Sequence, residues 1–406
     1  MDTGLWIAYL ALGFMAVLPI YLGSHASLKI PKKVASCEHG QPTAHPGKNG
    51  EEVASAADDE AEFFSFDDAK WFPIFGSVTL FSLYLVFKFF DREYVNMLLS
   101  AYFVILGVGA LYKTALAISR AATGLELKGA YRLDLWKHEN EIFSARFGKY
   151  HIGLLVASIV VGGLYTYSKH WILSNMYGEA FSAQAIQLLN LDSFKTGMAL
   201  LAGLFFYDIF WVFGTDVMVT VAKSFDAPIK VVWPKDIFEN AQFTMLGLGD
   251  IVIPGIFIAL CLQFDHAQYL KSTAGKKNKF ATSFPKPYFL ACFIAYILGL
   301  ITTVVVMHTY KAAQPALLYL SPACILSALL TALVRGETKQ LFGFDPNPDS
   351  AAAAKKNDDV KGEPKEPKAE KPKAAPAKMH ATRAASEEEE KPKTRTSPRK
   401  KGGKTA

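Results

Sequence analysis

Two apolar segments, joined by a polar loop, decide the fold: Leu201-Ala-Gly-Leu-Phe-Phe-Tyr207-Asp208-Ile-Phe-Trp-Val-Phe-Gly-Thr215 and Gln242-Phe-Thr-Met-Leu-Gly247-Leu248-Gly249-Asp250-Ile-Val-Ile-Pro254-Gly255-Ile-Phe-Ile-Ala-Leu-Cys-Leu-Gln263. Each belongs to an apolar run long enough to cross a bilayer, for which about 20 residues are needed. Each carries one carboxylate well inside that run, Asp208 in the first and Asp250 in the second. A charge at such a place costs about 2.5–3.5 kcal/mol on insertion scales, so an acid there indicates a functional site.

Asp208 and Asp250 are expected to lie at the same depth in the membrane, which indicates that they form a pair. The segments are joined by a short loop, so they run antiparallel and share one membrane face. If both are helices, Asp208 and Asp250 lie roughly 10–12 Å below that face at about 1.5 Å of rise per residue. Gly247 and Gly249 should loosen the second helix and let a backbone or a substrate come close. Two carboxylates in a low dielectric resist ionising together, so they share a proton, and one can activate water while the other acts as an acid.

Three short motifs carry a resemblance to a known family. They are Phe206-Tyr207-Asp208, Gly247-Leu248-Gly249-Asp250 and Gln314-Pro315-Ala316-Leu317, and they resemble, in order, the motifs of the intramembrane aspartyl proteases. The longer strings Tyr207–Gly214, Val217–Phe225 and Asp250–Leu260 resemble the signal peptide peptidase family, which is related to presenilin. The resemblance is tightest over Trp171–Leu333, weaker over Leu5–Lys113, and absent from the tail.

The resemblance implies an intramembrane-cleaving aspartic endopeptidase of the endoplasmic reticulum membrane. Its substrates would be signal-peptide remnants and type II transmembrane segments. Asp208 and Asp250 would be the catalytic residues. The residues expected to support the active site or bind substrate are Tyr207, Gly247, Leu248, Gly249, Gln314, Pro315, Ala316 and Leu317. For Tyr207 the hypothesis is that its ring packs against the seventh span and its hydroxyl tunes the acid, with plain aromatic packing as the alternative. No cofactor, metal or nucleic acid is expected, and a homo-oligomer or partners in endoplasmic-reticulum-associated degradation are left open.

Composition points to an all-α, polytopic membrane protein, and its apolar runs give nine expected transmembrane helices. The resemblance implies that they form a presenilin-like bundle. Of the 406 residues, 51% are hydrophobic, and long runs carry no charge. The expected spans are Leu5–Leu22, Trp71–Phe90, Tyr94–Tyr112, His151–Tyr167, Trp171–Leu189, Lys195–Thr215, Gln242–Phe264, Tyr288–His308 and Gln314–Val334. Three of the four cysteines (Cys261, Cys292 and Cys324) lie in these spans and are interpreted as small buried hydrophobes.

Charge outside the spans predicts their orientation. Lys29, Lys32 and Lys33 follow the first span, which we expect to remain uncleaved. Residues 113–149 and 265–286 are also basic, so all three regions are placed in the cytosol by the positive-inside rule. Nine spans then put the N-terminus in the lumen and the C-terminus in the cytosol.

The chain divides into three expected parts. Residues 1–193 form an N-terminal membrane bundle of five spans with two cytosolic loops, and residues 194–344 form the catalytic membrane region, spans six to nine. Residues 345–406 hold 16 Lys and Arg against 11 Asp and Glu and no aromatic residue, which predicts a disordered, basic cytosolic tail. That tail shows no clear dilysine retrieval signal.

Two further acids, Glu179 and Asp216, lie in or next to the spans. Glu179 is interpreted as a solvated residue near the end of the fifth span, and Asp216 as a solvated residue at the membrane edge. A proton-coupled transporter or a cation channel also places carboxylates inside the membrane. The sequence shows no internal repeat of the kind that many transporters have, and no Lys or Arg partner for the two acids in the spans.

Overall fold

The computed structural model describes residues 3–28, 62–123, 131–137, 140–215, 217–224, 227–235, 242–272, 283–310 and 314–346. All belong to one compact unit, Met1–Ala354. Its longer helices are α1 (Thr3–Ser27), α2 (Phe66–Phe89), α3 (Arg92–Thr123), α4 (Lys149–Ser168), α5 (Trp171–Leu188), α6 (Phe194–Phe213), α8 (Gly249–Lys271), α10 (Pro287–Tyr310) and α11 (Leu317–Arg335); α7 (Val217–Ser224) and α12 (Thr338–Phe342) are short.

The prediction of an all-α, polytopic membrane protein is confirmed. Within the described residues, eight helices are long and apolar enough to cross a membrane, namely α1, α2, α3, α4, α6, α8, α10 and α11. The expected fifth span forms as the 18-residue helix α5. Because of its polar side chains it is the least apolar of the nine expected spans, and it is not one of the eight helices named above.

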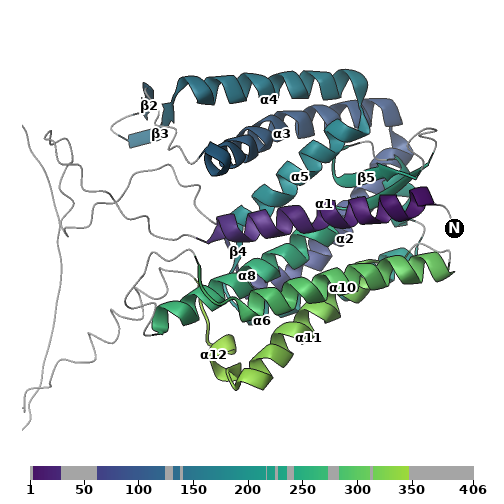
Figure 1. The fold of residues 1–406 in the computed structure, drawn as a ribbon. Helices are drawn as coiled ribbons and strands as arrows, with labels where there is room; N and C mark the ends of the chain where they lie inside the picture. The colour runs from purple at the N-terminus through teal and green to yellow at the C-terminus, as the bar shows by residue number, and fades with distance from the viewer. Residues whose placement is uncertain are drawn as a thin grey trace, which may run out of the picture. The chain divides into compact units, whose positions relative to one another are not determined.

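Helix α8 lies inside the bundle and packs against α1, α5, α6, α10 and α11 (Figure 1). Most of its residues are buried, whereas α2 and α3 expose large apolar side chains along most of their length. In water that exposure would be unfavourable, but against lipid tails it is the expected outer surface of a membrane bundle. The helix that carries Asp250 is therefore the one most shielded from lipid.

The helical assignment of Gln242–Gly247 is wrong. Phe243–Gly247 form strand β6, which pairs antiparallel with β5 (Lys230–Pro234), and α8 begins only at Gly249. Aromatic and β-branched residues favour a strand, and β5 supplies a partner rich in the same residues. The depth argument for Asp250 therefore does not hold as made, because the residues before it rise as a strand and Asp250 stands in the first turn of its helix.

Regions expected to be loops contain short strands. Strand β1 (Glu62–Phe64) pairs in parallel with β4 (Leu189–Leu191), and β2 (Tyr131–Lys137) pairs with β3 (Asn140–Phe147) as an antiparallel hairpin. Helix α2 begins before the expected start at Trp71, because Ser65 and Asp68 form a reciprocal capping box at its first turn.

The three cysteines of the spans are buried, as predicted, and come from α8, α10 and α11. The thiol of Cys292 donates to the carbonyl of Cys324 at 3.7 Å, a weak contact inside the apolar core. Their environment is that of small hydrophobic residues.

Candidate active site

Asp208 and Asp250 come from different helices of the bundle. Asp208 lies on α6 and is only 5% exposed, and its Oδ2 atom has no hydrogen-bond partner within the described part of the chain. Asp250 lies in the first turn of α8 and lines a cavity of about 400 Å³. The two carboxylates are close enough to interact electrostatically. A buried carboxyl oxygen without a hydrogen bond is unfavourable in free energy unless a ligand or a water molecule donates to it.

The segment of the third motif lies next to both acids. Gln314 and Ala316 line the same cavity as Asp250. The backbone N–H of Leu317 lies beside the carboxylate of Asp208. Pro315 opens the turn that begins α11, where its carbonyl accepts from Leu318 N–H at 3.3 Å. The structure thus brings together residues that are 64 positions or more apart in the sequence.

The two glycines of the second motif differ in their surroundings. A Cβ atom on Gly247 would lie 3.4 Å from Oδ2 of Asp250, whereas a Cβ atom on Gly249 would meet nothing within 4 Å. Leu248, between them, packs against α5 at Gly178, where its Cδ2 atom would lie 3.4 Å from an added Cβ. Gly247 therefore keeps the space beside the carboxylate open, and Leu248 anchors the segment.

Tyr207 lies on the side of α6 that meets α2. A Cβ atom on Gly76 of α2 would lie 3.5 Å from its ring. Its ring also stands 6.3 Å from that of Trp211, whose indole N–H donates to the Ser77 hydroxyl on α2 at 3.0 Å. The packing of Tyr207 against α2 was not expected from the sequence.

Tyr296 of α10 is a site residue that sequence reasoning missed. Its side chain is fully buried, and its hydroxyl donates to the backbone carbonyl of Asp250 at 3.3 Å. In a regular helix that carbonyl accepts from the N–H four residues later, which here is Pro254, and proline has no N–H. Pro254 was the available signal, because a proline four residues after Asp250 leaves that carbonyl in need of another donor.

Replacement of Tyr296 by Phe should weaken the site without removing an acid. The Asp250 carbonyl would be left buried and unpaired, which costs about 1–3 kcal/mol. We expect a lower melting temperature and a fall in kcat of roughly fivefold or more, as the first turn of α8 loosens.

Pro254→Ala provides the matching test, since it restores a backbone N–H to the same carbonyl. In the Tyr296→Phe background it should recover part of the lost stability and kcat. If Pro254→Ala adds its own loss instead, the hydroxyl does not act through this carbonyl.

The predictions for the two other acids, Glu179 and Asp216, can be compared with the structure only in part. Glu179 lies in the middle of α5, and its Oε1 atom is buried and has no hydrogen-bond partner among the described residues. The interpretation of Glu179 as a solvated residue is therefore wrong. Asp216 lies outside the described residues. In the described part of the chain, no group of three or more His, Cys, Asp or Glu side chains could hold a metal ion.

A bundle of apolar helices that holds two interacting acids, one of them lining a cavity, is compatible with an intramembrane aspartic peptidase. A family model described as signal peptide peptidase matches residues 56–348. The chain is 42% identical over 360 residues to the signal peptide peptidase of Homo sapiens, and 43% to that of Mus musculus, with 86% of each chain covered. It is also 41% identical over 277 residues to a probable intramembrane protease of Schizosaccharomyces pombe, covering 68% of this chain and 82% of that one. The chain belongs to the signal peptide peptidase family and is an intramembrane aspartic peptidase. This membership decides against the transporter that the acids alone had allowed.

Proposed function

We propose that Asp208 and Asp250 are the catalytic dyad of this peptidase. One carboxylate takes a proton from water as the water attacks the scissile carbonyl, and the other, protonated, donates to the departing amide nitrogen. The observation that carries the proposal is that the segment leading into α11 lies next to both acids: Gln314 and Ala316 line the cavity beside Asp250, and the N–H of Leu317 lies beside Asp208. The N–H of Leu317 would help to hold the Asp208 carboxylate in place.

The proposed substrates are signal-peptide remnants and type II transmembrane segments in the endoplasmic reticulum membrane. The names of the human and mouse relatives support this substrate class. The test is direct: the purified full chain in detergent should cleave a labelled signal peptide, and a transition-state mimic with a hydroxyl between the two carboxylates should block it. A purified, folded chain that leaves the peptide intact would contradict the proposal.

Strand β6 is proposed to hold the substrate as an added strand. A peptide bond in a helix is shielded by its own hydrogen bonds, so cleavage requires the substrate to unwind. The cavity beside Asp250 is lined by four consecutive residues of β6, Phe243–Leu246. Successive side chains of a strand point to opposite faces, so a cavity that touches all four runs along an edge of the strand.

The hydrogen-bond pattern indicates which backbone groups face that edge. Lys235 N–H donates to the Gln242 carbonyl at 2.8 Å, and Leu248 N–H donates to the Ile229 carbonyl at 3.1 Å. Antiparallel pairs alternate between bonded and non-bonded, so Met245 opposite Val232 is a non-bonded pair.

The outer edge of β5 is already hydrogen-bonded to the side chain of Asn175. The side chain of Asn175 donates to the Val232 carbonyl at 2.7 Å and accepts from the Val232 N–H at 2.8 Å. By the same alternation, Phe243, Met245 and Gly247 direct their N–H and C=O groups away from β5. An unwound peptide could pair with these groups and bring its next bond to Asp250.

Orientation of the substrate follows from the proposed orientation of the enzyme. Gly4 of α1 lies against the carbonyl of Lys235, so the Lys235 end of β5 lies at the end of the bundle that we assign to the lumen. Strand pairing has a direction, and family resemblance sets this arrangement opposite to that of presenilin. Substrates should therefore have their N-termini in the cytosol.

One reporter segment tested in both orientations should be cut only when its N-terminus is cytosolic. The two reporters are matched for flanking charge and expression, and cleavage is read from the size of the product. Helix-breaking residues in the segment should speed cleavage, and a poly-Leu span should resist it. Equal cleavage in both orientations would refute the direction argument and leave the dyad untouched.

A further inference from the structure

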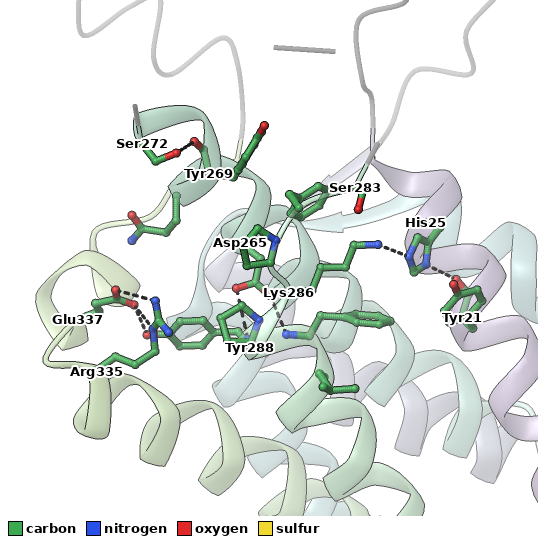
Figure 2. Close-up of a pocket in the computed structure, with 16 residues that line it drawn as sticks. Tyr21, His25, Asp265, Tyr269, Ser272, Ser283, Lys286, Tyr288, Arg335 and Glu337 are labelled. Atoms are coloured by element: carbon green, nitrogen blue, oxygen red, sulfur yellow. Dashed lines mark hydrogen bonds and ion pairs between the residues drawn. The ribbon is translucent and has the colours of Figure 1, made fainter. Parts of the chain in front are cut away.

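A second cavity lies at the other end of α1 from the contact between Gly4 and Lys235. It measures about 820 Å³ and is formed by the end of α1, the end of α8, the start of α10 and the residues that follow α11 (Figure 2). It shares no lining residue with the cavity beside Asp250. By the orientation proposed above, it opens at the cytosolic face of the membrane.

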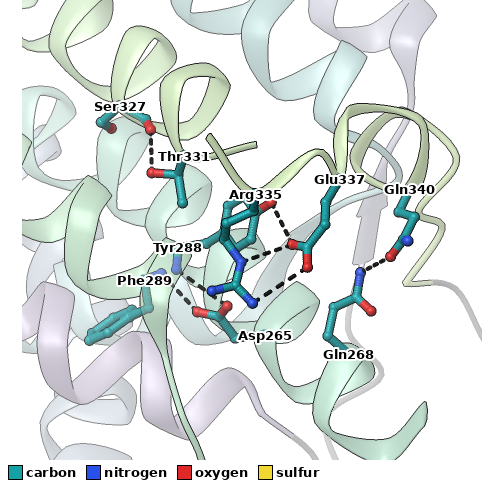
Figure 3. A network of polar contacts seen from close by, with 9 residues as sticks. All are labelled: Asp265, Gln268, Tyr288, Phe289, Ser327, Thr331, Arg335, Glu337 and Gln340. Carbon is teal, nitrogen blue, oxygen red and sulfur yellow. Dashed lines mark hydrogen bonds and ion pairs between the residues drawn. The ribbon is translucent and has the colours of Figure 1, made fainter. Parts of the chain in front are cut away.

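On one side of this cavity, both carboxylates are engaged by hydrogen bonds or an ion pair within the protein. Asp265 of α8 accepts from the backbone N–H groups of Tyr288 and Phe289 at 3.3 and 2.9 Å, which closes the start of α10 (Figure 3). The Tyr288 hydroxyl donates to Glu337 at 2.8 Å, and Arg335 pairs with Glu337 at 3.1 Å. The turn at Gly336, with a φ of 67° that favours glycine, brings Glu337 back to both partners. Both carboxylates that line the cavity are therefore occupied.

The opposite side carries a cation that no carboxylate neutralises. Lys286 Nζ lies 2.9 Å from Nε2 of His25, and Nδ1 of the same ring lies 2.9 Å from the carbonyl of Tyr21. A carbonyl can only accept and an ammonium can only donate, so the proton is on Nδ1 and the ring is neutral. No acid of the described residues lies within ion-pair distance of Lys286. One ammonium hydrogen is used by His25, and two are left for a ligand in the cavity.

The side chains near Lys286 are suited to the headgroup of a lipid. Lys286 Nζ lies 5.1 Å from the centre of the Phe284 ring, and the Tyr21 ring packs against His25 with 4.3 Å between ring centres. Tyr21 and Leu290 line the cavity and are 47% and 54% exposed, so its mouth is continuous with the apolar outer surface of α1 and α10. A ligand that suits both parts has an anionic head and an apolar tail. Basic pockets between helices at the cytosolic side bind anionic lipid headgroups in this way.

We propose that this cavity binds the headgroup of an anionic phospholipid, with the lipid phosphate on Lys286 and the acyl chains along α1 and α10. Such a lipid joins the end of α1 to the start of α10. Both helices also line the cavity beside Asp250, through Leu12 and Leu300 among others. Binding of the lipid should therefore stabilise the folded enzyme and raise its melting temperature.

The test uses the full chain in detergent, titrated with short-chain phosphatidylserine and, separately, with phosphatidylcholine. Phosphatidylserine should raise the melting temperature in a saturable manner, and phosphatidylcholine should not. Lys286→Gln should weaken the apparent affinity about tenfold, as expected for the loss of one charge-assisted hydrogen bond, and Lys286→Arg should restore most of it. Lys271→Gln is the control, because Lys271 is an exposed lysine at the end of α8 that does not line the cavity.

Each alternative has its own result. Equal losses in Lys286→Gln and Lys271→Gln would mean general surface charge and would overturn the proposal. Saturation by inorganic phosphate at the same concentration as by the lipid would assign a soluble anion, and stabilisation by an acidic peptide but not by the lipid would assign a protein ligand. Either would also overturn it. The readout is stability, so the result does not depend on whether Asp208 and Asp250 catalyse cleavage.

Discussion

Asp208→Asn, Asp250→Asn and the double substitution are expected to lose cleavage to the same extent, to below a tenth of the original rate and in practice to background. If the two acids share one water and one proton, removal of either leaves the other without its partner. Residues that act as a unit show such non-additive losses. The readout is the rate of product formation from a labelled signal peptide, measured under single-turnover conditions.

All three variants should remain folded. An amide in place of a buried acid removes the cost of holding a charge in a low dielectric, so melting temperatures should stay level or rise. Asp67→Asn, the same change at an exposed position at the start of α2, should leave cleavage intact. Residual activity above a tenth in either single variant, or losses that add in the double variant, would refute the dyad.

Met245→Pro is expected to lower cleavage by about tenfold or more while the fold is retained. The ladder with β5 makes no use of the Met245 N–H, which by the alternation above points to the free edge. Proline removes that donor and places its ring where a substrate carbonyl would come. A net loss of about 0.5–1.5 kcal/mol for the hydrogen bond, with the clash in addition, accounts for the size of the effect.

Met245→Val is the matched control, since it changes the side chain to a strand-favouring residue and keeps the backbone N–H. It should cleave at close to the original rate. The decisive comparison is kcat/KM for the two variants beside their melting temperatures. If both variants lose activity equally, the side chain at 245 matters and the backbone edge does not. If Met245→Pro cleaves normally, substrate does not pair with β6.

Sequence alone located the two acids and the class of protein, because an acid within an apolar run is rare and the three motifs are specific. It failed where local pattern and tertiary pairing compete. Gln242–Gly247 continue an apolar run that is compatible with a helix, and only the partner strand β5, 9 to 17 residues away, makes them a strand. Glu179 stands on the least apolar span, which suggested solvent, yet its helix is enclosed by others. Neither result could be derived without knowing which segments meet.

The support of the active site by α10 has a consequence for biosynthesis. Helix α8 leaves the ribosome before α10 and α11, yet the carbonyl of Asp250 and the carboxylate of Asp265 both take their partners from α10. The segment beside Asp208 comes later still, at the start of α11. A nascent chain that has inserted both acids thus lacks the donors that hold one of them and the N–H beside the other. With Asp208 and Asp250 as the proposed dyad, we expect the chain to remain inactive until α10 and α11 have docked.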